Sequence, residues 1–173
     1  MNYKAKLHRI KAFVFDVDGV FTNGMVLATA EGDFLRMHNT KDGYAVRYAV
    51  AQGYPIGIIT GGDSDSIRQR FKMLGVTDVY LASRTKWNDF RDFCFKYHLQ
   101  PDEALFMGDD IPDIEAMERC GLAACPADAV HEVKEICAYI SDKSGGMGCV
   151  RDVIEQTLRL QGKWNLKSAA TSV

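Results

Sequence analysis

Short apolar runs alternate with amphipathic stretches along most of the chain. This alternation is typical of a parallel sheet that is covered by helices on both faces. The expected strands are residues 11–16, 55–59, 79–81, 104–107, 122–124 and 138–140. The expected helices are residues 42–51, 63–74, 86–98, the stretch from Pro112 that Gly121 ends, 128–135 and 149–160. The pattern predicts an α/β fold with a doubly wound, Rossmann-like parallel sheet, in one domain over residues 1–173.

Residues 21–38 interrupt this alternation. Two apolar segments, 25–29 and 34–37, flank a polar turn that contains Gly32, which predicts a β-hairpin flap inserted after the first strand. The hairpin carries more apolar surface than one exposed flap needs. We therefore expect it either to pack on its own domain or to pair with other subunits. No segment is large enough for a cap domain, and the tail 163–173 has few structure signals.

Composition limits the classes of function. With 173 residues, 47% of them apolar and 25% charged, the chain matches an ordinary globular domain. Its net charge of -2 provides no basic field for nucleic acid or a membrane surface. The five cysteines have no CxxC spacing, so we expect free thiols and a reducing cytoplasm. The N-terminus lacks a signal-peptide pattern, and no apolar run approaches a membrane span.

Aspartates, a threonine with two glycines, and a lysine follow the expected strands. These are Asp16 and Asp18, Thr60 with Gly61 and Gly62, Lys86 at a helix start, and Asp109, Asp110 and Asp113. Each alone has a structural explanation, as a turn, a helix cap or a solvated lysine. In a doubly wound sheet, however, the loops after the strands meet at one edge. Their joint appearance there favours phosphoryl transfer.

The chemistry assigns a use to each group. Mg²⁺ takes oxygen ligands, which Asp16, the carbonyl of Asp18 and Asp109 can supply. One carboxylate then serves as the nucleophile, and a second protonates the leaving alkoxide and activates water. Thr60 and the N–H of Gly61 can hold phosphate oxygens, and Lys86 adds a cation.

These motifs resemble the haloacid dehalogenase superfamily of phosphatases, in order and over nearly the whole chain. The first motif matches residues 16–20, the second Thr60-Gly61, the third Lys86 and the fourth residues 108–113. The resemblance implies that Asp16 is the nucleophile and Asp18 the general acid/base. It also implies that Asp109 is a magnesium ligand, that Asp113 orients the metal site or Lys86, and that Asp110 has a supporting role.

Two further segments, 39–43 and 145–153, resemble the capless 3-deoxy-D-manno-octulosonate 8-phosphate phosphatases. That resemblance implies hydrolysis of this sugar-acid phosphate in lipopolysaccharide precursor synthesis, and a homotetramer whose hairpins form a central barrel. It makes Asp42 and Arg151 candidate substrate contacts, and Arg68 and Arg70 are further candidates because they lie close to Gly62 in the sequence. One departure is Gly62, where such phosphatases usually carry arginine. A phosphatase of nine-carbon 2-keto-3-deoxynononate or sialic acid 9-phosphates therefore remains the alternative, and a catalytically idle assembly module is the non-enzymatic one.

Overall fold

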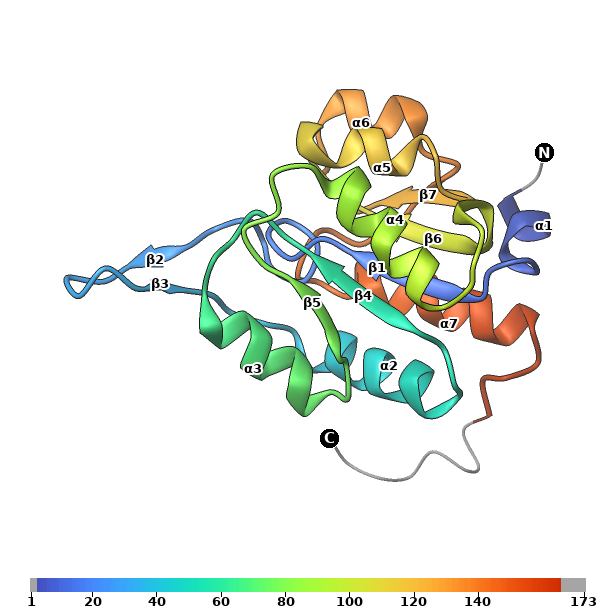
Figure 1. The fold of residues 1–173 in the computed structure, drawn as a ribbon, viewed down its shortest axis with the longest axis horizontal. Coiled ribbons are helices and arrows are strands. Elements are labelled where there is room, and N and C mark those ends of the chain that lie inside the picture. Colours follow the sequence, from blue (N-terminus) through green and yellow to red (C-terminus); the bar gives the residue numbers. More distant parts are fainter. Residues whose placement is uncertain (1–2, 166–173) are drawn as a thin grey trace.

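The computed structural model describes residues 3–165, and its centre is a six-stranded parallel sheet in the order β5-β4-β1-β6-β7-β8 (Figure 1). Its strands are β1 (Ala12–Phe15), β4 (Ile56–Ile59), β5 (Asp78–Tyr80), β6 (Ala104–Met107), β7 (Leu122–Cys125) and β8 (Tyr139–Ile140). The chain builds outward from β1 to β5 on one side and then crosses to β6 on the other. The predicted doubly wound sheet is confirmed. The strand order reverses at β1, and doubly wound folds bind their ligands at the point of this reversal.

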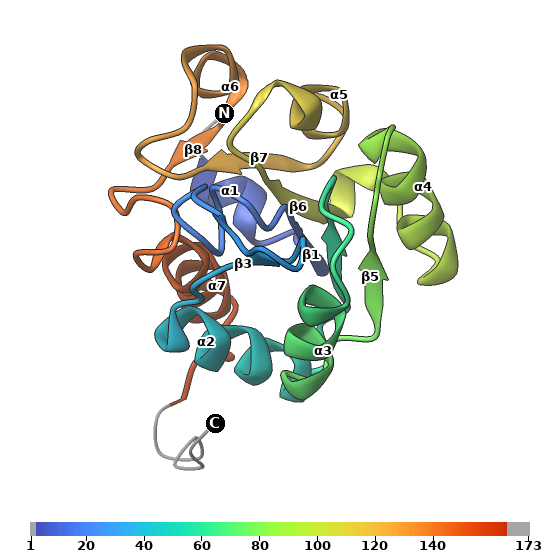
Figure 2. The same cartoon turned by 90° about the vertical axis from the view of Figure 1, so that its left-hand side faces the viewer.

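Side-chain alternation along β1 separates two cores. Phe13 and Phe15 belong to the cluster that packs against α1, α2, α3 and α7, whereas Ala12 and Val14 belong to the cluster against α4, α5 and α6. The views of Figures 1 and 2 show these two helical layers on opposite faces of the sheet. The helices are α1 (Tyr3–Leu7), α2 (Thr40–Ala51), α3 (Asp65–Met73), α4 (Lys86–Lys96), α5 (Ile114–Met117), α6 (His131–Ile136) and α7 (Cys149–Leu160). Within residues 3–165, no helix has the length and apolar character needed to cross a bilayer.

Several helices differ from their predicted bounds: α2 begins earlier, at Thr40, α4 ends at Lys96, and α6 begins at His131. The helix expected from Asp63 begins at Asp65, after Ser64 in an extended conformation. The reason is that the loop after β4 remains paired with the loop after β5: Ala82 N donates to Gly62 O at 3.0 Å. The helix expected from Pro112 divides into a 3-10 turn, Ile111–Asp113, and the single turn of α5.

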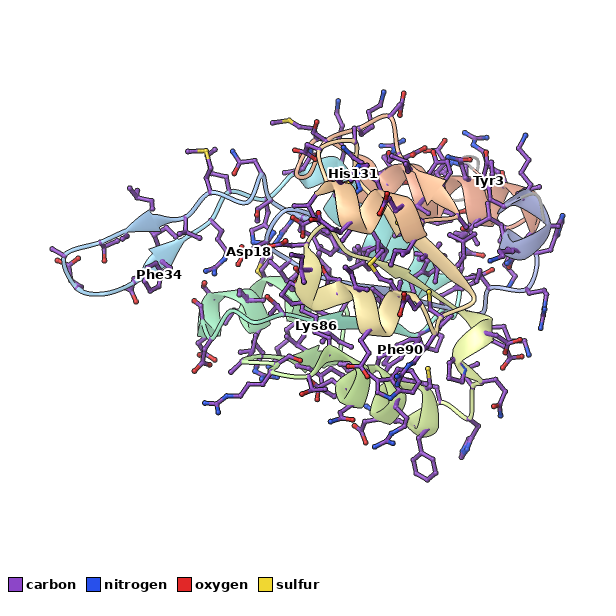
Figure 3. All side chains as sticks on the ribbon, turned by 90° about the horizontal axis from the view of Figure 1, so that it is seen from above. Tyr3, Asp18, Phe34, Lys86, Phe90 and His131 are labelled. Carbon is purple, nitrogen blue, oxygen red and sulfur yellow. The ribbon has the colours of Figure 1, made fainter. Side chains whose placement is uncertain are left out.

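The predicted hairpin is present and projects from the body of the protein (Figure 1). It consists of β2 (Leu27–Ala28) and β3 (Phe34–Leu35), in which Leu27 faces Leu35 across the strands. Its apolar side chains are exposed, with relative accessibilities of 67% for Leu27 and 82% for Met37. Figure 3 shows that Asp18 lies at the base of this hairpin, while Phe34 lies on its projecting arm.

Candidate active site

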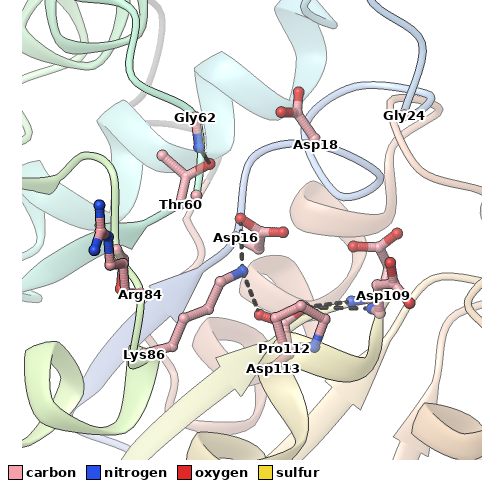
Figure 4. A pocket seen from close by; sticks show the side chains of 13 residues that line it. Asp16, Asp18, Gly24, Thr60, Gly62, Arg84, Lys86, Asp109, Pro112 and Asp113 are labelled. Atoms are coloured by element: carbon pink, nitrogen blue, oxygen red, sulfur yellow. Dashed lines mark hydrogen bonds and ion pairs between the residues drawn. The ribbon is translucent and has the colours of Figure 1, made fainter.

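One cavity of about 460 Å³ lies at the carboxyl edge of the sheet, where the loops after the strands meet (Figure 4). Most of the residues singled out from the sequence line it. These are Asp16, Asp18, Thr60, Gly61, Lys86, Asp109, Asp110 and Asp113. They come from the ends of β1, β4 and β6 and from the start of α4, so the order of the parallel strands brings them together.

Lys86 is the buried cation of this cavity. Its side chain is only 6% exposed, and Nζ lies 2.7 Å from Asp113 Oδ1 and 3.0 Å from Asp16 Oδ1. Burial by itself would lower the pKa of Lys86, but the two carboxylates raise it above its usual value. The side chain therefore stays charged and neutralises part of the acidic cluster.

Asp113 fixes the loop that carries Asp109. It is fully buried, and its Oδ2 accepts hydrogen bonds from the backbone N–H groups of Asp109 at 3.1 Å and Asp110 at 3.3 Å. Its other oxygen accepts from Lys86, so both carboxylate oxygens are engaged. Asp110 caps the following turn through its bond from Ile111 N. These contacts make the two residues supports for the site.

The pKa values of Asp16 and Asp109 are raised, because their ionised forms are buried close to other carboxylates. Burial, followed by repulsion from Asp113, raises the pKa of Asp16 to about 7 despite the nearby Lys86. Burial, followed by repulsion from Asp16 and Asp113, raises the pKa of Asp109 to about 8. The Oδ1 atom of Asp109 is buried and accepts no hydrogen bond from any residue within 3–165. An unpaired buried carboxylate is unfavourable unless a cation offsets it.

One oxygen from each of Asp16, Asp109 and Asp113 lies within 4.8 Å of the others. An all-oxygen set of this size suits a hard divalent cation. Asp109 can occupy its place in this cluster only because residue 19 is a glycine. A Cβ atom at Gly19 would lie 1.9 Å from Asp109 Oδ2, and the φ of Gly19, +81°, is one that glycine adopts readily. The glycine of the first motif therefore has a steric role in the site.

Thr60 lines the cavity from the loop after β4 and presents its hydroxyl group there. It is 1% exposed, and Oγ1 accepts a hydrogen bond from Gly62 N at 3.2 Å. That bond uses a lone pair of the oxygen, so the hydroxyl proton stays available to a phosphate oxygen. The backbone of this loop is held by Ser83, whose N–H donates to Thr60 O at 3.0 Å.

Asp18 lies at the mouth of the cavity and is paired with the hairpin. Arg36 Nε lies 2.7 Å from Asp18 Oδ1, and Arg36 Nη2 lies 3.0 Å from Asp18 Oδ2. The Asp18 side chain is 32% exposed and is not one of the three carboxylates within 4.8 Å. Asp18 is thus partly exposed and lies outside the carboxylate cluster, whereas Asp16 and Asp109 belong to that cluster.

The candidate substrate contacts lie elsewhere. Asp42 is completely buried, and its Oδ1 accepts from Arg151 N at 2.8 Å, so that it caps α7. Arg68 donates from Nη1 to Val79 O at 3.1 Å. None of them, Arg70 included, is among the residues of 3–165 that line the cavity.

Sequence reasoning missed two arginines near the cavity. Arg84 lines it from the loop between β5 and α4 (Figure 4) and is exposed. Its position in the loop after a predicted strand, two residues before Lys86, was a signal that could have found it. Arg36 lies on the apolar hairpin, and its pairing with Asp18 depends on the path of the folded chain, which no local pattern reveals.

Comparisons with known proteins show the family of this chain. The family model of haloacid dehalogenase-like hydrolases matches residues 26–121. The 3-deoxy-D-manno-octulosonate 8-phosphate phosphatase KdsC of Escherichia coli K12 is 33% identical over 159 residues, which are 92% of this chain and 85% of KdsC. The crystal structure of the same phosphatase from Yersinia pestis has 28% identity and a TM-score of 0.93, covering 99% of this chain and 91% of that one. The Moraxella catarrhalis phosphatase, crystallised with magnesium, phosphate and KDO, has 28% identity and a TM-score of 0.92, covering 98% of each chain.

Proposed function

Since this chain belongs to the haloacid dehalogenase-like hydrolases and is a phosphatase, we propose that it hydrolyses 3-deoxy-D-manno-octulosonate 8-phosphate with Mg²⁺ as its cofactor. The observation that carries the proposal is the Asp16 carboxylate, which lies in the cavity beside Lys86 and near Asp109. A phosphate monoester is anionic, so an attacking carboxylate needs nearby positive charge. The site offers Lys86 for this purpose and an acidic cluster that suits a metal ion.

The residues present fit a magnesium ion. Asp16 and Asp109 offer carboxylate oxygens. The Oδ1 atom of Asp109 is buried without a hydrogen bond among the described residues, Asp16 Oδ1 has only the ion pair with Lys86, and the pKa values of both carboxyl groups are raised. We propose these two side chains and the main-chain carbonyl of Asp18 as ligands. When bound, the ion supplies charge neutralisation for the phosphoryl group and for the acidic cluster.

The first step forms a covalent intermediate on Asp16. A carboxylate oxygen of Asp16 attacks phosphorus, and the bond between phosphorus and the sugar oxygen breaks. Asp18 gives its proton to that oxygen, so the sugar acid leaves with a neutral hydroxyl group there and not with an alkoxide. Thr60, the N–H of Gly61 and Lys86 bind the phosphoryl oxygens during the transfer.

The second step restores the enzyme. Asp18, now ionised, takes a proton from water, whose oxygen attacks the phosphorus of the aspartyl-phosphate. The bond between phosphorus and Asp16 breaks, and inorganic phosphate leaves while Asp16 regains its carboxylate. The supporting residues Asp110 and Asp113 keep Asp109 and Lys86 in place throughout.

The sugar-acid part of the substrate carries a carboxylate of its own. Arg84 is the cation that lines the cavity from the loop between β5 and α4, and we propose that it contacts this group. The alternative substrate is a nine-carbon keto-acid 9-phosphate, because Gly62 supplies no charged side chain at a residue that lines the cavity.

We also propose a homotetramer that forms through the exposed apolar hairpin, since exposed apolar surface of this kind marks an interface between proteins. A neighbouring subunit can then cover the open side of the cavity. All five cysteines are free, which fits a reducing cytoplasm. Arg68 and Arg151 act at most indirectly, since neither lines the cavity: Arg68 donates to Val79 O on β5, and Arg151 lies on α7 and pairs with Glu155.

Steady-state kinetics on a panel of phosphates tests the substrate. We expect kcat/KM for the octulosonate 8-phosphate to exceed that for the nine-carbon 9-phosphates, and to exceed that for simple sugar phosphates, which have no carboxylate, by roughly tenfold or more, as one charged hydrogen bond provides. The Arg84→Gln variant should remove the preference over simple sugar phosphates and leave activity on 4-nitrophenyl phosphate unchanged. A preference for a nine-carbon ester would assign the alternative substrate, and a flat profile would contradict both.

A further inference from the structure

The base of the hairpin holds one arginine whose guanidinium group is engaged on all three nitrogens. Arg36 Nε and Nη2 bind the two oxygens of Asp18, and Nη1 donates to the carbonyl of Phe34 at 2.9 Å. Its side chain is 8% exposed, although its neighbour Met37 is 82% exposed. Arg36 is thus turned into the body of the protein from an otherwise exposed segment.

The loop that follows β4 packs against the same guanidinium group. A Cβ atom at Gly62 would lie 3.1 Å from Arg36 Nη2 and 3.1 Å from Ile67 Cδ1, both tighter than ordinary van der Waals contact. Both Gly62 and Asp18 line the cavity. Arg36 therefore lies directly behind the cavity wall, between the loop after β1 and the loop after β4, and the missing side chain of Gly62 leaves space for it.

A bidentate arginine–carboxylate pair fixes the plane and direction of the carboxylate as well as its distance. Asp18 needs such a constraint because its side chain is 32% exposed at the mouth of the cavity. Proton transfer depends first on geometry, since the acid must lie within hydrogen-bond reach of the leaving oxygen. A freely rotating Asp18 would spend less time in that position.

We propose that Arg36 is a positioning residue that holds the carboxyl group of Asp18 for proton transfer to the leaving group. Arg36 uses one lone pair on each oxygen of Asp18, and the transferred proton occupies the second lone pair of one of these oxygens. The inference rests on the proposed function, because it requires Asp18 as the acid/base. Arg36 itself contacts no reacting atom. Its hydrogen bond to Phe34 O ties the group to β3, so the hairpin is part of the catalytic arrangement as well as an exposed arm.

A series of leaving groups tests this role. 4-Nitrophenolate leaves without being protonated, whereas phenolate and alkoxides are more basic and need an acid. The value of kcat/KM reports only the steps up to transfer onto Asp16, where the acid acts. We expect Arg36→Gln to lower kcat/KM by roughly tenfold or more for phenyl phosphate and glycerol 3-phosphate, but by less than about threefold for 4-nitrophenyl phosphate. Arg36→Lys, which keeps the charge and loses the bidentate pair, should fall between wild type and Arg36→Gln.

Two further variants exclude a merely structural effect. Arg9→Gln breaks an arginine–aspartate pair with Asp102 far from the cavity and should leave the whole series unchanged. Gly62→Ala, which pushes on Nη2 without removing charge, should give a smaller loss with the same dependence on the leaving group.

The double variant Asp18→Asn/Arg36→Gln separates the two proposals. If Arg36 acts through Asp18, the double variant is no slower than Asp18→Asn alone on any ester. Additive losses, an equal loss of Arg36→Gln on every ester, or no loss at all would overturn the role of Arg36. If Asp18→Asn itself shows no dependence on the leaving group, the acid/base assignment fails instead.

Discussion

The ammonium nitrogen of Lys86 lies 3.0 Å from Asp16 Oδ1. The two residues are far apart in sequence, and they meet because α4 begins at the edge where β1 ends. Both side chains are less than a tenth exposed, and Asp113 completes the cluster at 2.7 Å. Removing one charge from such a buried cluster leaves the others without a partner and destabilises the folded protein.

Replacing Lys86 by Met should therefore harm both catalysis and stability. We expect kcat to fall by roughly 10²–10³-fold, because one cation that faces the phosphoryl group is lost. The free energy of unfolding at pH 8 should fall by up to about 3–5 kcal/mol, since two buried carboxylates lose their partner. Steady-state kinetics and urea unfolding measure the two effects. The exposed Lys72→Met is the matched control, and an active Lys86→Met enzyme would contradict the proposed role.

Asp16→Asn should abolish turnover and preserve the fold. A carboxamide is a poor nucleophile, so we expect kcat to fall by roughly 10³-fold or more. The same change removes a buried charge beside Asp113, so the metal-free protein at pH 8 should be no less stable than wild type. Asp142→Asn, an exposed aspartate, serves as the control. Activity within tenfold of wild type would refute Asp16 as the nucleophile.

The apolar runs were sufficient to predict the architecture. Buried segments such as Ala12–Phe15 and Ala104–Met107 are short, continuous and followed by polar loops, so their place in a parallel sheet is readable from local pattern. The gathering of Asp16, Thr60 and Asp109 followed from that topology. Their catalytic roles remain predictions.

The contacts between distant segments could not be predicted in the same way. Asp42 and Arg151 were candidate substrate contacts because their segments resemble those of the octulosonate phosphatases, yet Asp42 accepts a hydrogen bond from the backbone of Arg151 at the start of α7. Conversely, Arg36 looked like part of an exposed flap. In both cases the deciding factor is how two elements pack, and that information is absent from either segment alone.

Magnesium should stabilise the protein more at high pH than at low pH. Without metal, the folded-state pKa values of Asp16 and Asp109 are about 7 and about 8, above those of an unfolded aspartate. Between pH 4 and pH 8 the folded state thus holds more protons, and the free energy of unfolding decreases as pH rises through this range. Bound Mg²⁺ needs the ionised carboxylates and removes this loss.

Differential scanning fluorimetry in EDTA and in excess Mg²⁺ measures this effect. We expect the increase in Tm with Mg²⁺ to be clear at pH 8.5 and small at pH 5.5. Asp109→Asn should reduce the Mg²⁺-dependent increase at pH 8.5. An increase that is independent of pH would contradict the assignment of these carboxylates as ligands.

Gly19→Ala should be much more harmful than the same change at a comparable glycine. Gly19 and Gly53 have similar φ values, +81° and +84°, so both substitutions carry the backbone cost of a left-handed residue, about 1–2 kcal/mol. Only at Gly19 does the new Cβ collide with another group, Asp109 Oδ2. We expect Gly53→Ala to lower stability and keep activity, while Gly19→Ala also raises the Mg²⁺ concentration needed for half-maximal activity. Equal effects of the two variants would show that the contact with Asp109 is unimportant.

The hairpin makes the oligomeric state testable. Leu27 and Leu35 face each other across β2 and β3 and are 67% and 51% exposed. Replacing them by Glu and Lys, respectively, removes this apolar surface, while the opposite charges keep a favourable cross-strand pair. If subunits associate through the hairpin, sedimentation velocity at micromolar concentration should show a tetramer for wild type and a monomer for Leu27→Glu/Leu35→Lys. Phe95→Lys removes an equally exposed apolar side chain from α4 and should leave the assembly unchanged. A wild-type protein that sediments as an active monomer would contradict the proposal, because the apolar hairpin would then tolerate water without a partner.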